Sequence, residues 1–83
     1  MTKANGQSMQ EFFTKDLQEA GAILASGIKL LRLQRENNFY WFVFEDQKTQ
    51  EICNKFWSGE LALPVKQYSD SLRTLKDRLF AQR

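Results

Sequence analysis

The sequence predicts an α+β fold in the order β-α-β-β-α-α, with a small, mostly antiparallel three-stranded sheet and three helices. Two apolar segments, residues 28–36 and 39–45, flank a pair of asparagines, which is the arrangement of a β-hairpin. Segments with helical spacing of apolar residues precede and follow this hairpin. The 83 residues, 42% hydrophobic and 27% charged, have the size and composition of one globular domain.

The N-terminal part of the chain is predicted to contribute a tail and a short strand. Residues 1–9 are polar and include a glycine, so we expect a flexible tail before a folded domain at residues 10–83. Residues 10–14, QEFFT, then form a first strand.

Residues 14–27, TKDLQEAGAILASG, predict the first helix. Thr14 is a suitable N-cap, and Gly27 is placed to end the helix. Gly21 has low helix propensity, but it would allow close approach to a sheet. The apolar stripe of this helix, with spacings of three and four, consists of Leu17, Ala20, Gly21, Leu24 and Ile28.

The hairpin predicts a specific register. A two-residue turn at Asn37 and Asn38 places Leu33 opposite Phe42 and, two residues further, Leu31 opposite Phe44. Opposed residues share a face of the sheet. One face therefore carries Leu31, Leu33, Tyr40, Phe42 and Phe44, and the second carries Arg32, Gln34, Phe39, Trp41 and Val43.

The strand at residues 39–45 is the most apolar of the three, so we place it in the centre of the sheet. Its first six residues are all apolar or aromatic, which makes both of its sides apolar. The first two helices are expected to cover the face of Phe42 and Phe44. The face of Trp41 is left for the third helix, a second copy of the chain or a ligand.

Two further helices follow the hairpin. Residues 46–59 predict a helix that Asp46 caps and Gly59 ends. One side of it carries Ile52, Cys53, Phe56 and Trp57. Pro64 suits the first turn of the last helix. The seam of that helix consists of Val65, Tyr68, Leu72, Leu75 and Leu79, a pattern that favours packing within the same domain.

The residue types argue against an enzyme. The chain contains no histidine and one cysteine, so it lacks the usual general base and the spacings of a zinc site. No glycine-rich phosphate loop is present. We interpret Cys53 as a small core residue and Glu45 and Asp46 as helix-capping acids. We therefore predict no catalytic residue, no metal, no cofactor and no small-molecule substrate.

Nucleic-acid binding is one alternative function, because basic residues gather in the last helix. Residues 64–83 contain five basic and two acidic residues, hence a net charge of +3, while the rest of the chain carries −1. The basic residues that could follow a phosphate backbone are Lys66, Arg73, Lys76 and Arg83. A second candidate is the sheet face with Arg32, Phe39 and Trp41, since aromatic side chains on a sheet can stack on bases.

Protein–protein interaction is the function that we favour from the sequence. Aromatic residues make up 13% of the chain, and its apolar surface exceeds what three short helices can cover. Exposed patches of this kind usually bind partners, and a symmetric homodimer is the commonest arrangement. The predicted interface consists of Arg32, Gln34, Phe39, Trp41 and Val43. We expect Trp41 to be substantially buried in the assembled protein.

Three segments resemble a family of small bacterial and phage proteins grouped as a domain of unknown function. These segments are the aromatic strand NNFYWFVFED, the helix end NKFWSGE and the basic helix LRTLKDRLF. The resemblance covers roughly residues 12–81. It implies an origin on bacterial or phage mobile elements, and it carries over no catalytic residue.

The compartment is predicted from what the N-terminus and the apolar runs lack. Residues 1–10 contain no apolar stretch of the kind that a secretory signal needs. The longest apolar run has six residues, against the roughly 20 that a membrane helix requires. With a single cysteine, these features lead us to expect a soluble cytoplasmic protein with no membrane partner.

Overall fold

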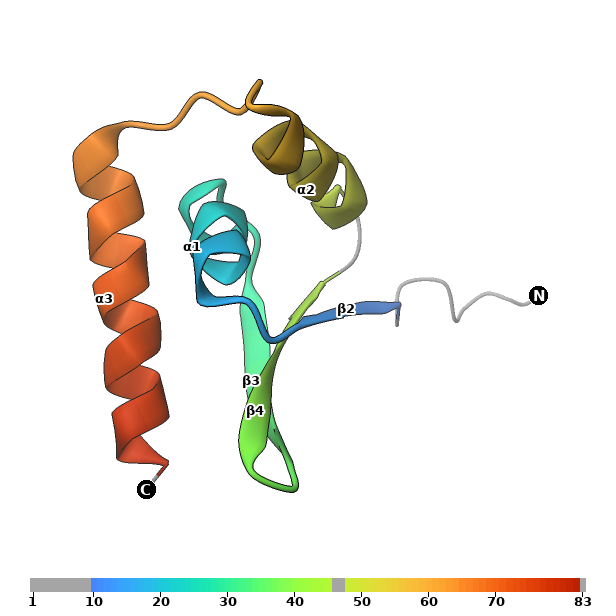
Figure 1. The fold of residues 1–83 in the computed structure, drawn as a ribbon, viewed down its shortest axis with the longest axis vertical. Helices are drawn as coiled ribbons and strands as arrows, with labels where there is room; N and C mark the ends of the chain where they lie inside the picture. Colours follow the sequence, from blue (N-terminus) through green and yellow to red (C-terminus); the bar gives the residue numbers. More distant parts are fainter. Residues whose placement is uncertain (1–9, 46–47, 83) are drawn as a thin grey trace.

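The sheet is built around the hairpin at Asn37, whose positive φ of 49° lets the chain reverse within two residues. The computed structural model describes residues 10–45 and 48–82. All strand pairs are antiparallel and their order is β2-β4-β3, so the apolar strand is central, as predicted (Figure 1). The strands are β2 (Glu11–Thr14), β3 (Leu30–Glu36) and β4 (Phe39–Glu45). The helices are α1 (Leu17–Ala25), α2 (Thr49–Ser58) and α3 (Val65–Ala81).

The register of the hairpin is confirmed over most of its length. The pairs run from Glu36 opposite Phe39 to Arg32 opposite Val43. Beyond Arg32 a β-bulge shifts the register, so that Leu30 rather than Leu31 faces Phe44. The predicted pairing of Leu31 with Phe44 was therefore wrong. The bulge adds one residue to β3 and turns Leu30 to the core.

α1 begins two residues later than the sequence predicted. Asp16, rather than Thr14, is the N-cap, and its carboxylate accepts a hydrogen bond from the Glu19 amide at 2.8 Å. Thr14 ends β2 and accepts a hydrogen bond from the Asp16 amide at 3.1 Å, so it shapes the turn into the helix. Gly27 follows the helix end with a φ of 95°, a conformation that favours glycine.

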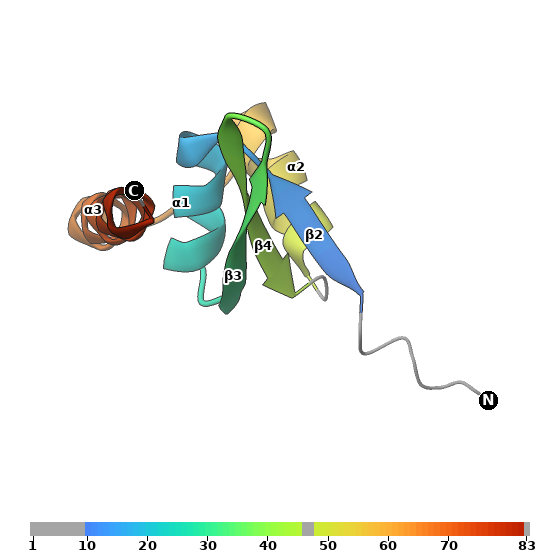
Figure 2. The same ribbon diagram turned by 90° about the horizontal axis from the view of Figure 1, so that it is seen from below.

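α1 is the central helix of the helical layer. It is buried on more sides than one apolar stripe would cover, because α2 and α3 flank it while the sheet lies beneath it. Figure 2 shows α3 on the side of α1 away from the sheet. Gly21 is a point of close approach, but to α3 rather than to a sheet: a β-carbon there would lie 2.6 Å from Leu72 and 3.3 Å from the ring of Tyr68.

α2 begins at Thr49 and ends where Gly59 adopts a φ of 83°. The N-cap is Lys48, which makes no capping bond through its side chain. The buried Thr49 instead donates from Oγ1 to the carbonyl of Glu45 and ties the helix to the end of β4. The predicted cap, Asp46, lies outside the described residues.

α3 begins at Val65, directly after Pro64, and is tied to the domain by side-chain hydrogen bonds. Tyr68 donates to the carbonyl of Gln18 at 3.1 Å, and Tyr40 donates to the carbonyl of Gln82 at 3.3 Å. Burial, with a smaller contribution from the Asp16 carboxylate, raises the pKa of Tyr68. Apart from Val65, which is 84% exposed, the predicted seam of α3 lies on the side that packs against the rest of the domain, as the sequence favoured.

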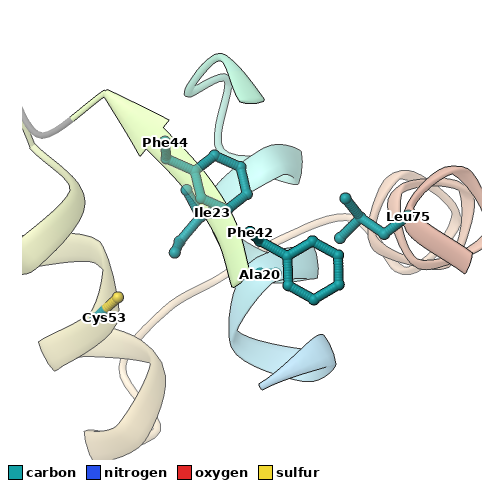
Figure 3. Close-up of a cluster of buried hydrophobic side chains, with 6 residues drawn as sticks. All are labelled: Ala20, Ile23, Phe42, Phe44, Cys53 and Leu75. Carbon is teal, nitrogen blue, oxygen red and sulfur yellow. The ribbon is translucent and has the colours of Figure 1, made fainter. Parts of the chain in front are cut away.

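The core lies between the helical layer and one face of the sheet. Figure 3 shows Phe42 directed toward Leu75 of α3, while Cys53 of α2 approaches from the opposite side. The cluster consists of Ala20, Ile23, Phe42, Phe44, Cys53 and Leu75. α3 therefore packs on the same face of the sheet as α1 and α2. Our suggestion that α3 could cover the face of Trp41 was wrong. Trp57 is also not a core residue: it is 60% exposed and donates from Nε1 to Glu19 at 2.6 Å.

Candidate functional site

The second face of the sheet is the surface opposite the helical layer. Strand alternation directs every second residue to it, and the interactions that these residues make come from the sheet itself and from Lys15, just after β2. The structure brings together on this face the five residues that the sequence predicted as an interface. The face consists of Glu11, Phe13, Arg32, Gln34, Glu36, Phe39, Trp41, Val43 and Glu45.

An aromatic row crosses the second face. Trp41 stands between two phenylalanines, in edge-to-face contact with Phe13 at 6.2 Å and with Phe39 at 5.3 Å between ring centroids. The Lys15 ammonium lies 4.8 Å from the centroid of the Phe39 ring, a cation–π contact. Trp41 and Phe39 are half-buried and Phe13 is 41% exposed. The row is therefore ordered by its own contacts but remains open to solvent.

Phe13 is the member of this row that the sequence analysis missed. It belongs to a strand of four residues, too short to show a pattern of alternation. Its place follows only from the pairing of β2 with β4, in which Phe13 stands opposite Val43. The signal that could have found it is that Phe12 and Phe13 are adjacent, so one of them must point away from the core.

A charged clasp spans the central strand. Arg32 of β3 reaches across β4 and binds Glu11 of β2 through two hydrogen bonds of 2.9 Å, while Gln34 accepts a 3.0 Å bond from the same guanidinium. The clasp crosses the sheet next to Val43, which is fully buried. The hydrogen bonds from Arg32 lower the pKa of Glu11, and those to Glu11 raise the pKa of Arg32.

The charge on the second face is acidic. Its strand residues include three carboxylates, Glu11, Glu36 and Glu45, and one cation, Arg32, which Glu11 already neutralises. Lys15 adds one positive charge at the hairpin end. A surface on which carboxylates outnumber cations does not favour a polyanion, because attraction of cations to phosphates supplies most of the affinity for nucleic acid.

The basic residues predicted on α3 lie elsewhere in the molecule. Arg73 and Lys76 flank a shallow hollow of about 300 Å³ together with Phe80. Lys66 lies a turn or more toward the start of the helix and pairs with Asp70 at 3.1 Å. Arg83 is outside the described residues. The described part of α3 thus brings together two of the four predicted residues.

The described residues do not gather a set of metal-binding groups. In residues 10–45 and 48–82, no three His, Cys, Asp or Glu side chains lie close enough to share a metal ion. Cys53 is 4% exposed and belongs to the core, so its thiol does not face a cleft. Within the same residues no helix is both long and apolar enough to cross a lipid bilayer.

These features define a class of protein: a small α+β domain with all of its described helices on one side of a three-stranded antiparallel sheet and an aromatic row on the other. The chain belongs to the family described as a domain of unknown function, DUF5659, which it matches over residues 9–81. This confirms the resemblance to a domain of unknown function that was drawn from the aromatic strand and the two helix segments. No curated protein and no solved structure shows a detectable match.

Proposed function

We propose that this chain is a non-enzymatic accessory or regulatory protein that acts by protein–protein contact, with the second face of the sheet as its interface and a second copy of the chain as its partner. The proposal includes a bacterial or phage mobile-element origin and a cytoplasmic location. One observation carries it: the row of Phe13, Trp41 and Phe39 lies on the face that the helices leave open. Tryptophan and other aromatic residues dominate the binding energy of protein interfaces.

The charge of the second face favours a protein over a nucleic acid. Its carboxylates outnumber its cations, and the Arg32 guanidinium is already bound to Glu11 and Gln34. A protein partner tolerates this balance, because interfaces combine an apolar centre with a polar rim. The aromatic row supplies such a centre, and Glu36 and Glu45 supply its rim.

A second copy is the partner that this face fits most economically. A face that binds itself about a two-fold axis buries the same aromatic row twice, and most soluble oligomers have such closed symmetry. Burial of the row would also remove the aggregation hazard of an open apolar sheet. Trp41 is half-buried in the single chain, so dimerisation should complete its burial.

The experiment uses Trp41 as both the contact and the reporter. Trp57 is first replaced by phenylalanine, because its exposed indole would otherwise contribute to the fluorescence. Sedimentation velocity of this Trp57→Phe chain should show a dimer, and acrylamide quenching of Trp41 should rise on dilution as the dimer dissociates. Trp41→Ser in the otherwise unchanged chain should sediment as a monomer and lose stability.

A matched control lies on the other side of the molecule. Phe80 of α3 is 63% exposed, and Phe80→Ser removes an aromatic ring far from the second face. It should leave the dimer intact. A wild-type chain that is strictly monomeric, with Trp41 open to quencher, would overturn the proposal. So would binding of single-stranded nucleic acid that Trp41→Ser abolishes, since that result assigns the row to base stacking.

A further inference from the structure

We infer that the two copies pack their second faces with their β4 strands antiparallel, so that Lys15 of each copy pairs with Glu45 of the other. This inference rests on the proposed homodimer and specifies its geometry. It follows from an imbalance of charge between the two ends of the second face. Among the residues that the structure describes, one end offers a cation without a carboxylate partner, and the other offers a carboxylate without a cation.

The hairpin end of the face carries the cation. Lys15 follows β2, and its ammonium lies 4.8 Å from the ring centroid of Phe39, the first residue of β4. Among the described residues it forms no ion pair. The ring orients the ammonium on the second face, next to the aromatic row, where a carboxylate from a facing surface could reach it.

The opposite end of the face carries the carboxylate. Glu45 ends β4, stands opposite Glu11 and is exposed. Two carboxylates at directly opposed positions repel each other. Glu11 escapes this repulsion through its two hydrogen bonds with Arg32, whereas no described cation pairs with Glu45.

A two-fold axis relates these two ends. Aligned sheet packing keeps the strand directions of facing sheets within about 30°. Consider a two-fold axis that lies in the interface plane and runs perpendicular to the strands. Rotation about it places β2 of one copy over β2 of the other and reverses the direction of β4. The Lys15 end of one copy therefore lies over the Glu45 end of its partner. The two ends are six residues apart on β4, roughly 20 Å, so both Lys15–Glu45 pairs form at the rim with the aromatic row between them.

The other face-to-face arrangement places like charges together. A two-fold axis parallel to the strands superposes β4 on β4 in the same direction, so Glu45 of one copy meets Glu45 of the other. It also places Lys15 near the partner's Glu36, which is at the hairpin end of β3. Like-charge contacts at an interface suppress the arrangement that contains them. The charges of this face therefore select the antiparallel packing.

The test exchanges the two charges and mixes the resulting chains. Lys15→Glu and Glu45→Lys should each weaken the dimer by about tenfold or more, because each places like charges face to face twice per dimer. The double variant should regain an affinity within about threefold of the wild type. An equimolar mixture of the two single variants should form a heterodimer, since both of its contacts are then Glu–Lys pairs. Sedimentation velocity measures dimer formation in each of these four samples: the two single variants, the double variant and the mixture.

Glu36→Lys provides the matched control, since it changes the same residue type on the same face. Mixed with Lys15→Glu, it should form a heterodimer no more tightly than the wild type does with Lys15→Glu, because in both mixtures the antiparallel packing leaves one like-charge contact at Glu45. A heterodimer that is tighter with Glu36→Lys than with the wild type would establish the parallel arrangement and overturn the inference. Equal affinity of every variant in a dimeric protein would also overturn it while leaving the interface itself intact. A monomeric wild type would instead refute the proposed function. Lys15, Glu36 and Glu45 are exposed, so the variants keep the core that folds the chain.

Discussion

Replacing Gly21 by alanine tests how α1 and α3 are held together. A β-carbon at this position would lie 2.6 Å from Cδ2 and 3.2 Å from Cγ of Leu72, and 3.3 Å from the ring of Tyr68. Ordinary contact between carbon atoms needs about 3.5–4.0 Å, so Leu72 would have to move by about 1 Å. The Tyr68 ring can move little, because its hydroxyl is hydrogen-bonded to the carbonyl of Gln18.

Two effects of opposite sign decide the result. Alanine favours a helix over glycine by about 1 kcal/mol, and overpacking a filled interface costs about 1–3 kcal/mol. The Leu72 methyl group can rotate away in part, but its Cγ and the Tyr68 ring cannot both yield without separating the helices. We therefore expect Gly21→Ala to lower the free energy of unfolding by about 1 kcal/mol, a fall in Tm of about 4–8 °C.

Urea unfolding measured by circular dichroism checks this value, and Leu72→Ala supplies the matched background. With the Leu72 side chain shortened, the two closest contacts disappear, so Gly21→Ala should become stabilising by up to about 1 kcal/mol. The predicted change of sign is the decisive feature. If Gly21→Ala stabilises the otherwise unchanged chain, α3 does not press on Gly21, and the packing described for these two helices is incorrect.

Two further predictions concern Cys53 and the Arg32–Glu11 clasp. Cys53→Ala should lower the free energy of unfolding by on the order of 1 kcal/mol. The Cys53 thiol should also react with a thiol reagent far more slowly in the native chain than in the urea-unfolded chain. Equal reaction rates would contradict its place in the core. Because the pKa of Glu11 is lowered from 4.5 in the folded state, the clasp stabilises the fold above that pH and is lost as the pH falls through the folded pKa. Unfolding measured between pH 6 and pH 2 should show this small component in the wild type and not in Glu11→Gln. An identical pH profile would mean that the clasp contributes nothing.

Local signals predicted much of the fold. The two asparagines set the length of the turn, and the turn determined the pairs from Glu36–Phe39 to Arg32–Val43 and with them both faces of the sheet. Gly27 and Gly59 marked helix ends because each adopts a positive φ there. Such features depend on residues close in sequence, so a single sequence contains them.

Other features depend on contacts that a local pattern does not encode. The bulge that replaces Leu31 by Leu30 opposite Phe44 arises where β3 meets the chain leaving α1. The choice of Asp16 over Thr14 as N-cap depends on β2 extending to Thr14. The apolar seam of α3 fitted either side of the sheet, and only the cluster around Leu75 shows which side it serves.

The clasp between Arg32 and Glu11 also bears on where β2 joins the sheet. Phe12 and Phe13 are adjacent and both apolar, so hydrophobicity alone would let the strand shift by one residue without losing an aromatic ring from the core. A shift of one residue would turn Glu11 toward the helices and bury its carboxylate, and a shift of two would move it about 7 Å along β4, away from Arg32. One ion pair between two strands that are not neighbours thus favours a single alignment of β2. A chain in which Arg32 and Glu11 are both replaced by alanine should therefore populate more than one pairing of its first strand.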